Sequence, residues 1–69
     1  MPELVQRVYE VFARARLSEP LAHVGSVRAA GEDLARTYAR TTYDEERWAE
    51  MVAVPRDCLI TVIERKQRP

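Results

Sequence analysis

The chain has 69 residues and a formal net charge of zero, with 11 basic and 11 acidic residues. Its length indicates one domain, whose single core supplies only about 3–5 kcal/mol and would gain from association with another chain. A nucleic-acid-binding domain normally carries a basic excess that neutralises phosphates, so the balanced charge argues against that class.

The first half of the chain opens on an ambiguous segment, residues 4–15. One set of apolar residues fits a helical stripe, namely Leu4, Val5, Val8, Val11, Phe12 and Ala15. The abundance of Val, with Tyr9 and Phe12, favours a strand instead. A break follows at residues 17–20, where Pro20 disfavours helix at the preceding residue. Residues 21–29 are predicted to form a short strand in which Gly25 marks a bulge or a close backbone approach.

The most regular pattern predicts a helix over residues 31–46. Its apolar positions recur at helical spacing and are Leu34, Ala35, Tyr38, Ala39 and Thr42. Gly31 is an acceptable N-cap, and acidic residues in the first turn suit the helix dipole. Residues 49–54 and 58–64 are β-rich and predict two more strands, separated by a turn after Pro55. The polar tail, residues 65–69, is expected to fray.

The residues that usually carry chemistry are few. His23 is the only histidine and Cys58 the only cysteine, whereas a zinc site needs three or four ligands and a di-iron site needs paired Glu-x-x-His motifs. Cys58 precedes an apolar run and is expected to be a small buried side chain. With two glycines in the chain there is no phosphate-binding loop. We therefore expect no catalytic residue, no metal and no cofactor.

Two features near the middle of the chain allow two interpretations each. The acidic run Asp44-Glu45-Glu46 is either a solvated loop or a docking patch for a basic partner. Trp48 is either a core residue or an anchor at an interface, where tryptophan is enriched. The chain starts without a charged-then-apolar signal pattern, and no apolar run reaches the roughly 20 residues that cross a bilayer. We expect a cytoplasmic protein.

Two longer strings carry a resemblance to a known family. They are Tyr9-Glu10-Val11-Phe12-Ala13-Arg14 and His23-Val24-Gly25-Ser26-Val27-Arg28-Ala29-Ala30, and the match continues at Ala35, Ala39, Arg40 and Tyr43. Over residues 8–43 the chain resembles the phenylacetic acid degradation protein B family, the small B subunit of phenylacetyl-CoA epoxidase (phenylacetate-CoA oxygenase). It departs from that family at Gly31, where the family has an acidic residue, and at the acidic run after Tyr43.

The resemblance implies a fold and a role. The residue patterns already predict a single α+β domain with element order β-β-α-β-β and one helix on an antiparallel sheet, and the resemblance adds that residues 8–14 are a strand that pairs with residues 21–28 in a hairpin. The role is a non-catalytic subunit that bridges the di-iron catalytic and structural subunits of an oxygenase in aromatic catabolism, with the reductase as a further candidate partner. The candidate partner-interface residues are His23, Arg28, Arg40 and Tyr43.

Two further expectations complete the sequence-based interpretation. Residues 59–63 would make an apolar edge strand, which favours a homodimer because an unpaired edge invites pairing. The competing function is a cofactor-free, dimeric α+β barrel enzyme with His23 as its base. A deep apolar pocket converging on His23 would favour that enzyme, and a flat or strand-edge surface would favour the subunit.

Overall fold

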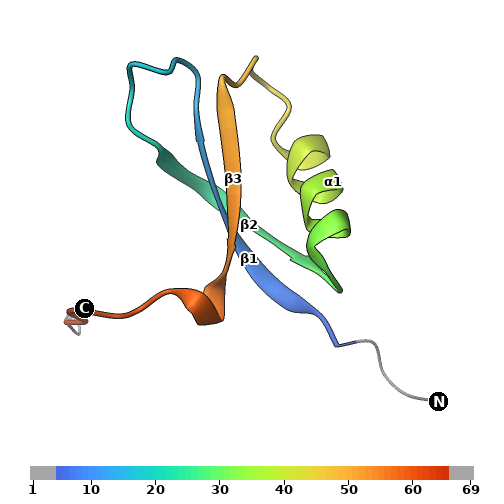
Figure 1. Ribbon diagram of the computed structural model, residues 1–69, viewed down its shortest axis with the longest axis vertical. Coiled ribbons are helices and arrows are strands. Elements are labelled where there is room, and N and C mark those ends of the chain that lie inside the picture. Colours follow the sequence, from blue (N-terminus) through green and yellow to red (C-terminus); the bar gives the residue numbers. More distant parts are fainter. Residues whose placement is uncertain (1–4, 66–69) are drawn as a thin grey trace, which may run out of the picture.

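The computed structural model describes residues 5–65. Its first two elements are strands of eight residues each (Figure 1). β1 (Arg7–Arg14) and β2 (Ala22–Ala29) pair antiparallel. In β1 the side chains of Tyr9, Val11 and Ala13 alternate into the core, as the two-residue period of a strand requires. The strand predicted for residues 4–15 is thus confirmed as β1, with residue 4 outside the described residues, and the helical stripe in this segment does not mark a helix.

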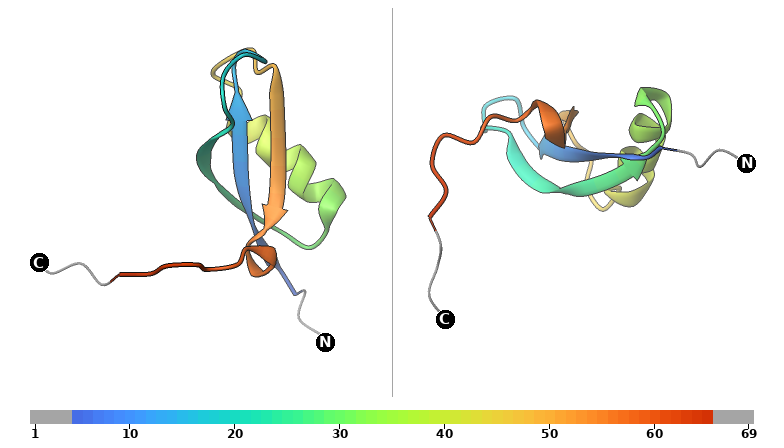
Figure 2. Two further views of the ribbon diagram at one scale, coloured as in Figure 1. Left: turned by 60° about the vertical axis from the view of Figure 1, so that its left-hand side comes forward. Right: turned by 90° about the horizontal axis from the view of Figure 1, so that it is seen from below.

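The sheet has three strands in the order β2-β1-β3, all antiparallel. β3 (Glu50–Pro55) returns along the other side of β1, so that β1 is central and both neighbours are edges. α1 (Glu32–Thr42) packs on one face of this sheet, mainly over β2 (Figure 2). The α+β class with one helix on an antiparallel sheet is therefore confirmed.

The core lies between α1 and the hairpin and is made of small side chains. Its buried members are Tyr9, Val11, Val27, Ala29, Ala35 and Ala39. Two alanines on α1 let the helix approach the sheet closely, so the contact is narrow. Leu34 and Tyr38, which the sequence placed on the same apolar face, remain 45% and 42% exposed, so the predicted apolar face was too wide.

α1 is shorter than the predicted span of residues 31–46. It begins after Gly31, which is the N-cap, and ends at Thr42. Beyond it the acidic run at residues 44–46 is exposed, and negative charge is unfavourable at the C-terminal end of a helix. The Trp48 indole donates a 2.6 Å hydrogen bond to the carbonyl of Tyr43, which holds the chain in a turn. Trp48 itself is half-buried.

The predicted fourth strand, residues 58–64, is not part of the sheet. A 3₁₀ turn, η1 (Arg56–Cys58), follows β3 directly and is tied to β1 by two ion pairs, Arg7 with Asp57 and Arg56 with Glu10. These contacts draw the chain across to β1 instead of back along the free edge of β3. Residues 59–65 consequently run away from the sheet and from α1 (Figure 2). Of the tail expected to fray, residues 66–69 lie outside the described residues.

The position of Cys58 also shows that the predicted strand at residues 58–64 is wrong. It is exposed within η1, whereas the sequence placed it in a buried strand. A strand at residues 58–64 would have packed its side chains on the sheet. Because η1 turns the chain outward before that strand could form, the thiol has nothing to pack against.

Candidate functional site

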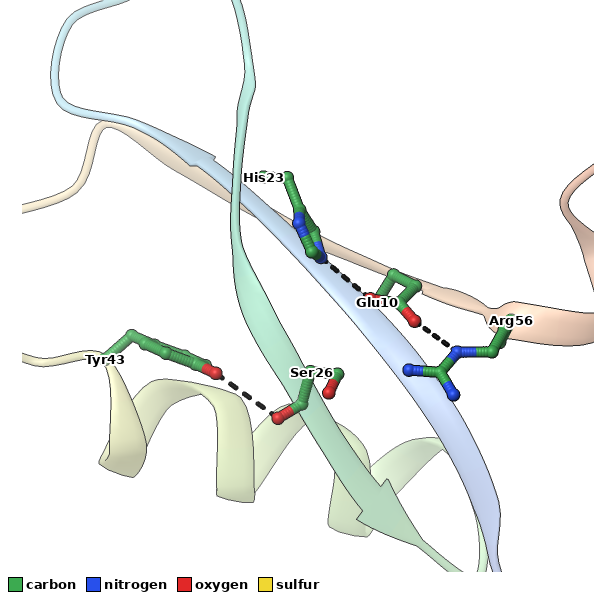
Figure 3. Close-up of polar contacts among 5 residues, drawn as sticks. All are labelled: Glu10, His23, Ser26, Tyr43 and Arg56. Carbon is green, nitrogen blue, oxygen red and sulfur yellow. Dashed lines mark hydrogen bonds and ion pairs between the residues drawn. The ribbon is translucent and has the colours of Figure 1, made fainter. Parts of the chain in front are cut away.

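A polar cluster lies on the face of the sheet opposite α1, here called the outer face. Glu10 in β1 is its centre, and its side chain is only 10% exposed. The Nε2 atom of His23 lies 2.7 Å from one carboxylate oxygen of Glu10, and Arg56 donates a short hydrogen bond to the other (Figure 3). Three elements, β1, β2 and η1, therefore converge on one carboxylate.

The electrostatics of the cluster keep Glu10 ionised. The hydrogen bond from Arg56 lowers the pKa of the Glu10 carboxyl, and the hydrogen bond from His23 lowers it further. The same occurs at η1, where the hydrogen bond from Arg7 lowers the pKa of Asp57. Both carboxylates form ion pairs that hold η1 against β1. Their first role is therefore structural.

His23 carries one element of a catalytic base, an orienting carboxylate. Its ring lies 5.1 Å from the ring of Phe12, measured between centroids, and its side chain is 53% exposed. It stands on β2, an edge strand. The imidazole therefore rests on an open surface with an aromatic neighbour beside it, where a substrate would not be enclosed.

The glycine of the His-Val-Gly-Ser string has a structural purpose. Gly25 has φ +156°, and a Cβ at this position would overlap the hydroxyl of Tyr43. That hydroxyl donates a 3.2 Å hydrogen bond to the carbonyl of Ser26 (Figure 3). The register of the hairpin shifts beside it, between Val11 and Phe12. The predicted bulge and close backbone approach at Gly25 are both confirmed.

The four interface candidates do not form one surface. His23 and Arg28 lie exposed on the outer face. Arg28 alternates with the buried residues of β2, whereas His23 follows the register shift of the hairpin, pairs with Phe12 and contacts Glu10. Arg40 is on α1 and lines a cavity beside β3. Tyr43 is half-buried against Gly25 and the core. The C-terminal end of α1 thus sends Arg40 towards β3 and Tyr43 towards β2.

Sequence reasoning missed Glu10 and Arg56 as members of the cluster. Glu10 is an acidic residue inside an otherwise apolar strand, and a charge there needs a partner because burial disfavours it. That signal is present in the sequence once residues 4–15 are assigned to a strand. Arg56 gave no comparable signal, because its place depends on the path of η1.

A groove runs between α1 and β3 on the other face of the sheet. It consists of two adjoining cavities of about 470 and 280 Å³. Its apolar lining is Tyr9, Ala35, Ala39, Met51, Val52, Ala53 and Pro55, and its charged residues are Arg7, Glu32, Arg36 and Arg40. The groove exists because α1 leans towards β2 and leaves this side of β3 uncovered. His23 does not line it.

Within residues 5–65, no three His, Cys, Asp or Glu side chains gather in a way that could hold a metal ion. Among the described residues, α1 is too short and too polar to cross a membrane, and no other helix could do so. Comparisons of the chain with family models, with curated proteins and with solved structures found no match.

Proposed function

We propose that this chain is a non-catalytic bridging subunit of a cytoplasmic multicomponent oxygenase of the phenylacetyl-CoA type. Its partners would be the di-iron catalytic subunit and the structural subunit, with the reductase as a further candidate. The motif residues support this role by their distribution. Gly25, Ala35, Ala39 and Tyr43 serve the packing of β2 and α1, which leaves the outer face as the surface that the same motif presents to other proteins.

One observation carries the proposal. His23, whose side chain is the best suited to catalysis among the motif residues, lies exposed on an edge strand. Its side chain is 53% exposed, and the α1–β3 groove is lined by other residues. An enzyme needs a concave site that excludes water around its base. An edge strand with exposed polar side chains is instead a surface on which a second protein can dock.

The outer face has the composition of an interface. Half-buried apolar side chains surround the Glu10 cluster and are, by strand alternation, Val8, Phe12, Val52 and Val54. Arg14 and Glu50 pair at 2.5 Å beside them, and Arg28 lies exposed on β2. Phenylalanine and arginine, both present on this face, are enriched in protein–protein interfaces.

Co-purification with the catalytic and structural subunits of a phenylacetyl-CoA oxygenase tests the proposal. We expect the unmodified chain to be retained by the tagged catalytic or structural subunit. Arg28→Glu, which reverses a charge on the outer face, should reduce retention about tenfold, as a lost interface contact of about 1.4 kcal/mol would. Arg16→Glu makes the same charge change in the exposed β1–β2 turn and should leave retention unchanged.

The competing function, a base-catalysed reaction at His23, is favoured by the Glu10–His23 hydrogen bond alone. It predicts turnover of a small substrate by the isolated chain and its loss in His23→Gln. If the chain is never retained by any oxygenase subunit and shows such turnover, the bridging role is wrong.

A further inference from the structure

The segment that follows η1, residues 59–63, is the most exposed apolar part of the described chain. Leu59, Ile60, Val62 and Ile63 are 49%, 88%, 87% and 68% exposed. The segment runs outward in an extended path, away from α1 (Figure 2). Leaving four large aliphatic side chains in water forgoes roughly 1.5–3 kcal/mol for each one that could be fully buried.

The order of apolar and polar residues in the segment indicates the environment that it suits. A strand with one buried face alternates apolar and polar residues, whereas a strand covered on both faces is apolar at successive positions. Residues 59–63 read Leu-Ile-Thr-Val-Ile, which is apolar on both alternating sets. The segment therefore fits a position in a sheet that is covered from above and from below.

The segment cannot reach such a position in its own chain. The free edge of β3 is the nearest one, but the ion pairs from η1 to Arg7 and Glu10 carry the chain to the β1 side. A hairpin back along β3 would require both pairs to break. The outward path of residues 59–65 is thus set by charged contacts rather than by a lack of affinity for the sheet.

The free edge of β3 offers a position that suits the segment. β3 is an edge strand, and the α1–β3 groove lies beside it with an apolar floor that includes Met51 and Ala53. An added strand at this edge would form backbone hydrogen bonds with β3 and place alternate side chains in the groove. The other side chains would face the chain from which the segment comes.

Charge at the groove agrees with this occupant. Arg40 lines the groove and has no ion-pair partner among the described residues. Glu64 directly follows the apolar segment and is exposed. A segment lying along β3 would carry this acidic residue towards Arg40, whereas Arg36, at the same groove, is already paired with Glu32 and Asp33.

We infer that residues 59–63 of one chain add to the free edge of β3 in a second copy and fill its α1–β3 groove. Each copy has both the segment and the groove, so a two-fold arrangement satisfies both at once and closes the assembly as a dimer. The exchange also covers an edge strand and an apolar segment that would otherwise invite aggregation. This inference does not depend on the proposed oxygenase role.

Full-length variants test the exchange by sedimentation equilibrium. Ile60→Glu with Val62→Glu charges the segment, and Ala53→Glu fills the groove, where the new carboxylate can pair with Arg36 or Arg40. The unmodified chain should be a dimer at micromolar concentration. The segment variant should weaken the dimer at least about 100-fold, since two buried aliphatic side chains are lost per interface half. The groove variant should weaken it comparably, because the new side chain occupies the space of the segment. Leu17→Glu with Leu21→Glu, in the exposed turn before β2, should dimerise normally.

Mixing the two disabled variants gives the decisive result. The groove of the segment variant is intact, and the segment of the groove variant is intact, so a heterodimer regains one of the two contacts. We expect heterodimers in the mixture under conditions where each variant alone is monomeric, with circular dichroism melts showing that both remain folded. A monomeric unmodified chain, variants that dimerise normally, a control that does not dimerise, or a mixture without heterodimers would each overturn the inference.

Discussion

The hairpin and the helix with its C-cap, residues 7–43, differ sharply from the later part of the chain, residues 50–65. Every member of the buried core belongs to the first region. In the second region the residues of β3 are half-buried or exposed, η1 has no buried residue and residues 59–65 are all exposed. The first region is held by packing, and the second by one strand ladder and the ion pairs of η1.

The two regions therefore contribute differently to the molecule. The first region contains what the domain needs to fold, including the Gly25–Tyr43 contact and the two alanines of α1. The second region supplies apolar surface in excess of what its own domain can cover. A small domain whose core is limited in this way gains stability when a partner covers that surface.

The largest effect on stability is expected when the closest contact of the first region, between Gly25 and Tyr43, is disturbed. Gly25→Ala places a methyl group against the Tyr43 ring and requires an unfavourable φ, so we expect a loss of about 2–3 kcal/mol in unfolding free energy. Gly31→Ala is the matched control, because a Cβ there meets no atom within 4 Å. Its cost should stay below about 1 kcal/mol. Equal losses in urea unfolding would contradict the packing account.

The second prediction compares one valine from each region. Val11 is fully buried in β1, whereas Val62 is 87% exposed. Val11→Ala should cost about 2 kcal/mol, because buried methyl groups and a small cavity are both involved. Val62→Ala, measured in dilute monomeric protein, should change stability by less than about 0.5 kcal/mol. A comparable cost for Val62→Ala would show that the segment packs within its own chain.

The third prediction uses acid to loosen the second region. Hydrogen bonds from Arg56 and then His23 lower the pKa of Glu10 in the folded protein. Their contribution to stability is therefore present above the unfolded pKa, about 4.5, and is lost as pH falls through the lower folded pKa. The melting temperature of the unmodified chain should fall across this range, and that of Glu10→Gln should start lower and fall less.

The matched control for this titration is Glu45→Gln, an exposed acidic residue in the loop after α1. Its melting curve should follow that of the unmodified chain at every pH. If Glu10→Gln and Glu45→Gln behave alike, the Glu10 cluster does not hold η1 to the sheet.

The smallest effect is expected at the junction between the two regions. Trp48→Phe removes the indole N–H that bonds to the Tyr43 carbonyl but keeps an aromatic ring. One hydrogen bond contributes about 0.5–1.5 kcal/mol, so the loss should lie in that range. A loss several times larger would mean that Trp48 is a core residue, which is one of the interpretations its sequence context left open.

Sequence reasoning succeeded where local pattern and packing agree. The strand at residues 21–29, the role of Gly25, the burial of Ala35 and Ala39 and the Gly31 cap all follow from short-range patterns that the fold does not override. For residues 4–15 the helical and strand patterns conflicted, and the family resemblance decided correctly in favour of a strand.

The errors arose where contacts distant in sequence decide the structure. Residues 58–64 have strand composition, but η1 is directed by ion pairs spanning 50 residues for Arg7–Asp57 and 46 for Glu10–Arg56. No local pattern reveals those pairs. Leu34 and Tyr38 fit an apolar helical face, yet the lean of α1 over β2 leaves them partly exposed. The Glu10 cluster was missed for the same reason, because Arg56 reaches it only through the path of η1.

Amide hydrogen exchange of the unmodified chain, measured at a dilute and at a concentrated condition, tests the contrast between the regions most directly. The account predicts that amides of β1 and β2 at their shared ladder are protected in both conditions. It predicts that amides of residues 59–63 exchange freely when dilute and become protected when concentrated. Protection of residues 59–63 in the dilute monomer, or their free exchange in a concentrated dimer, would contradict it.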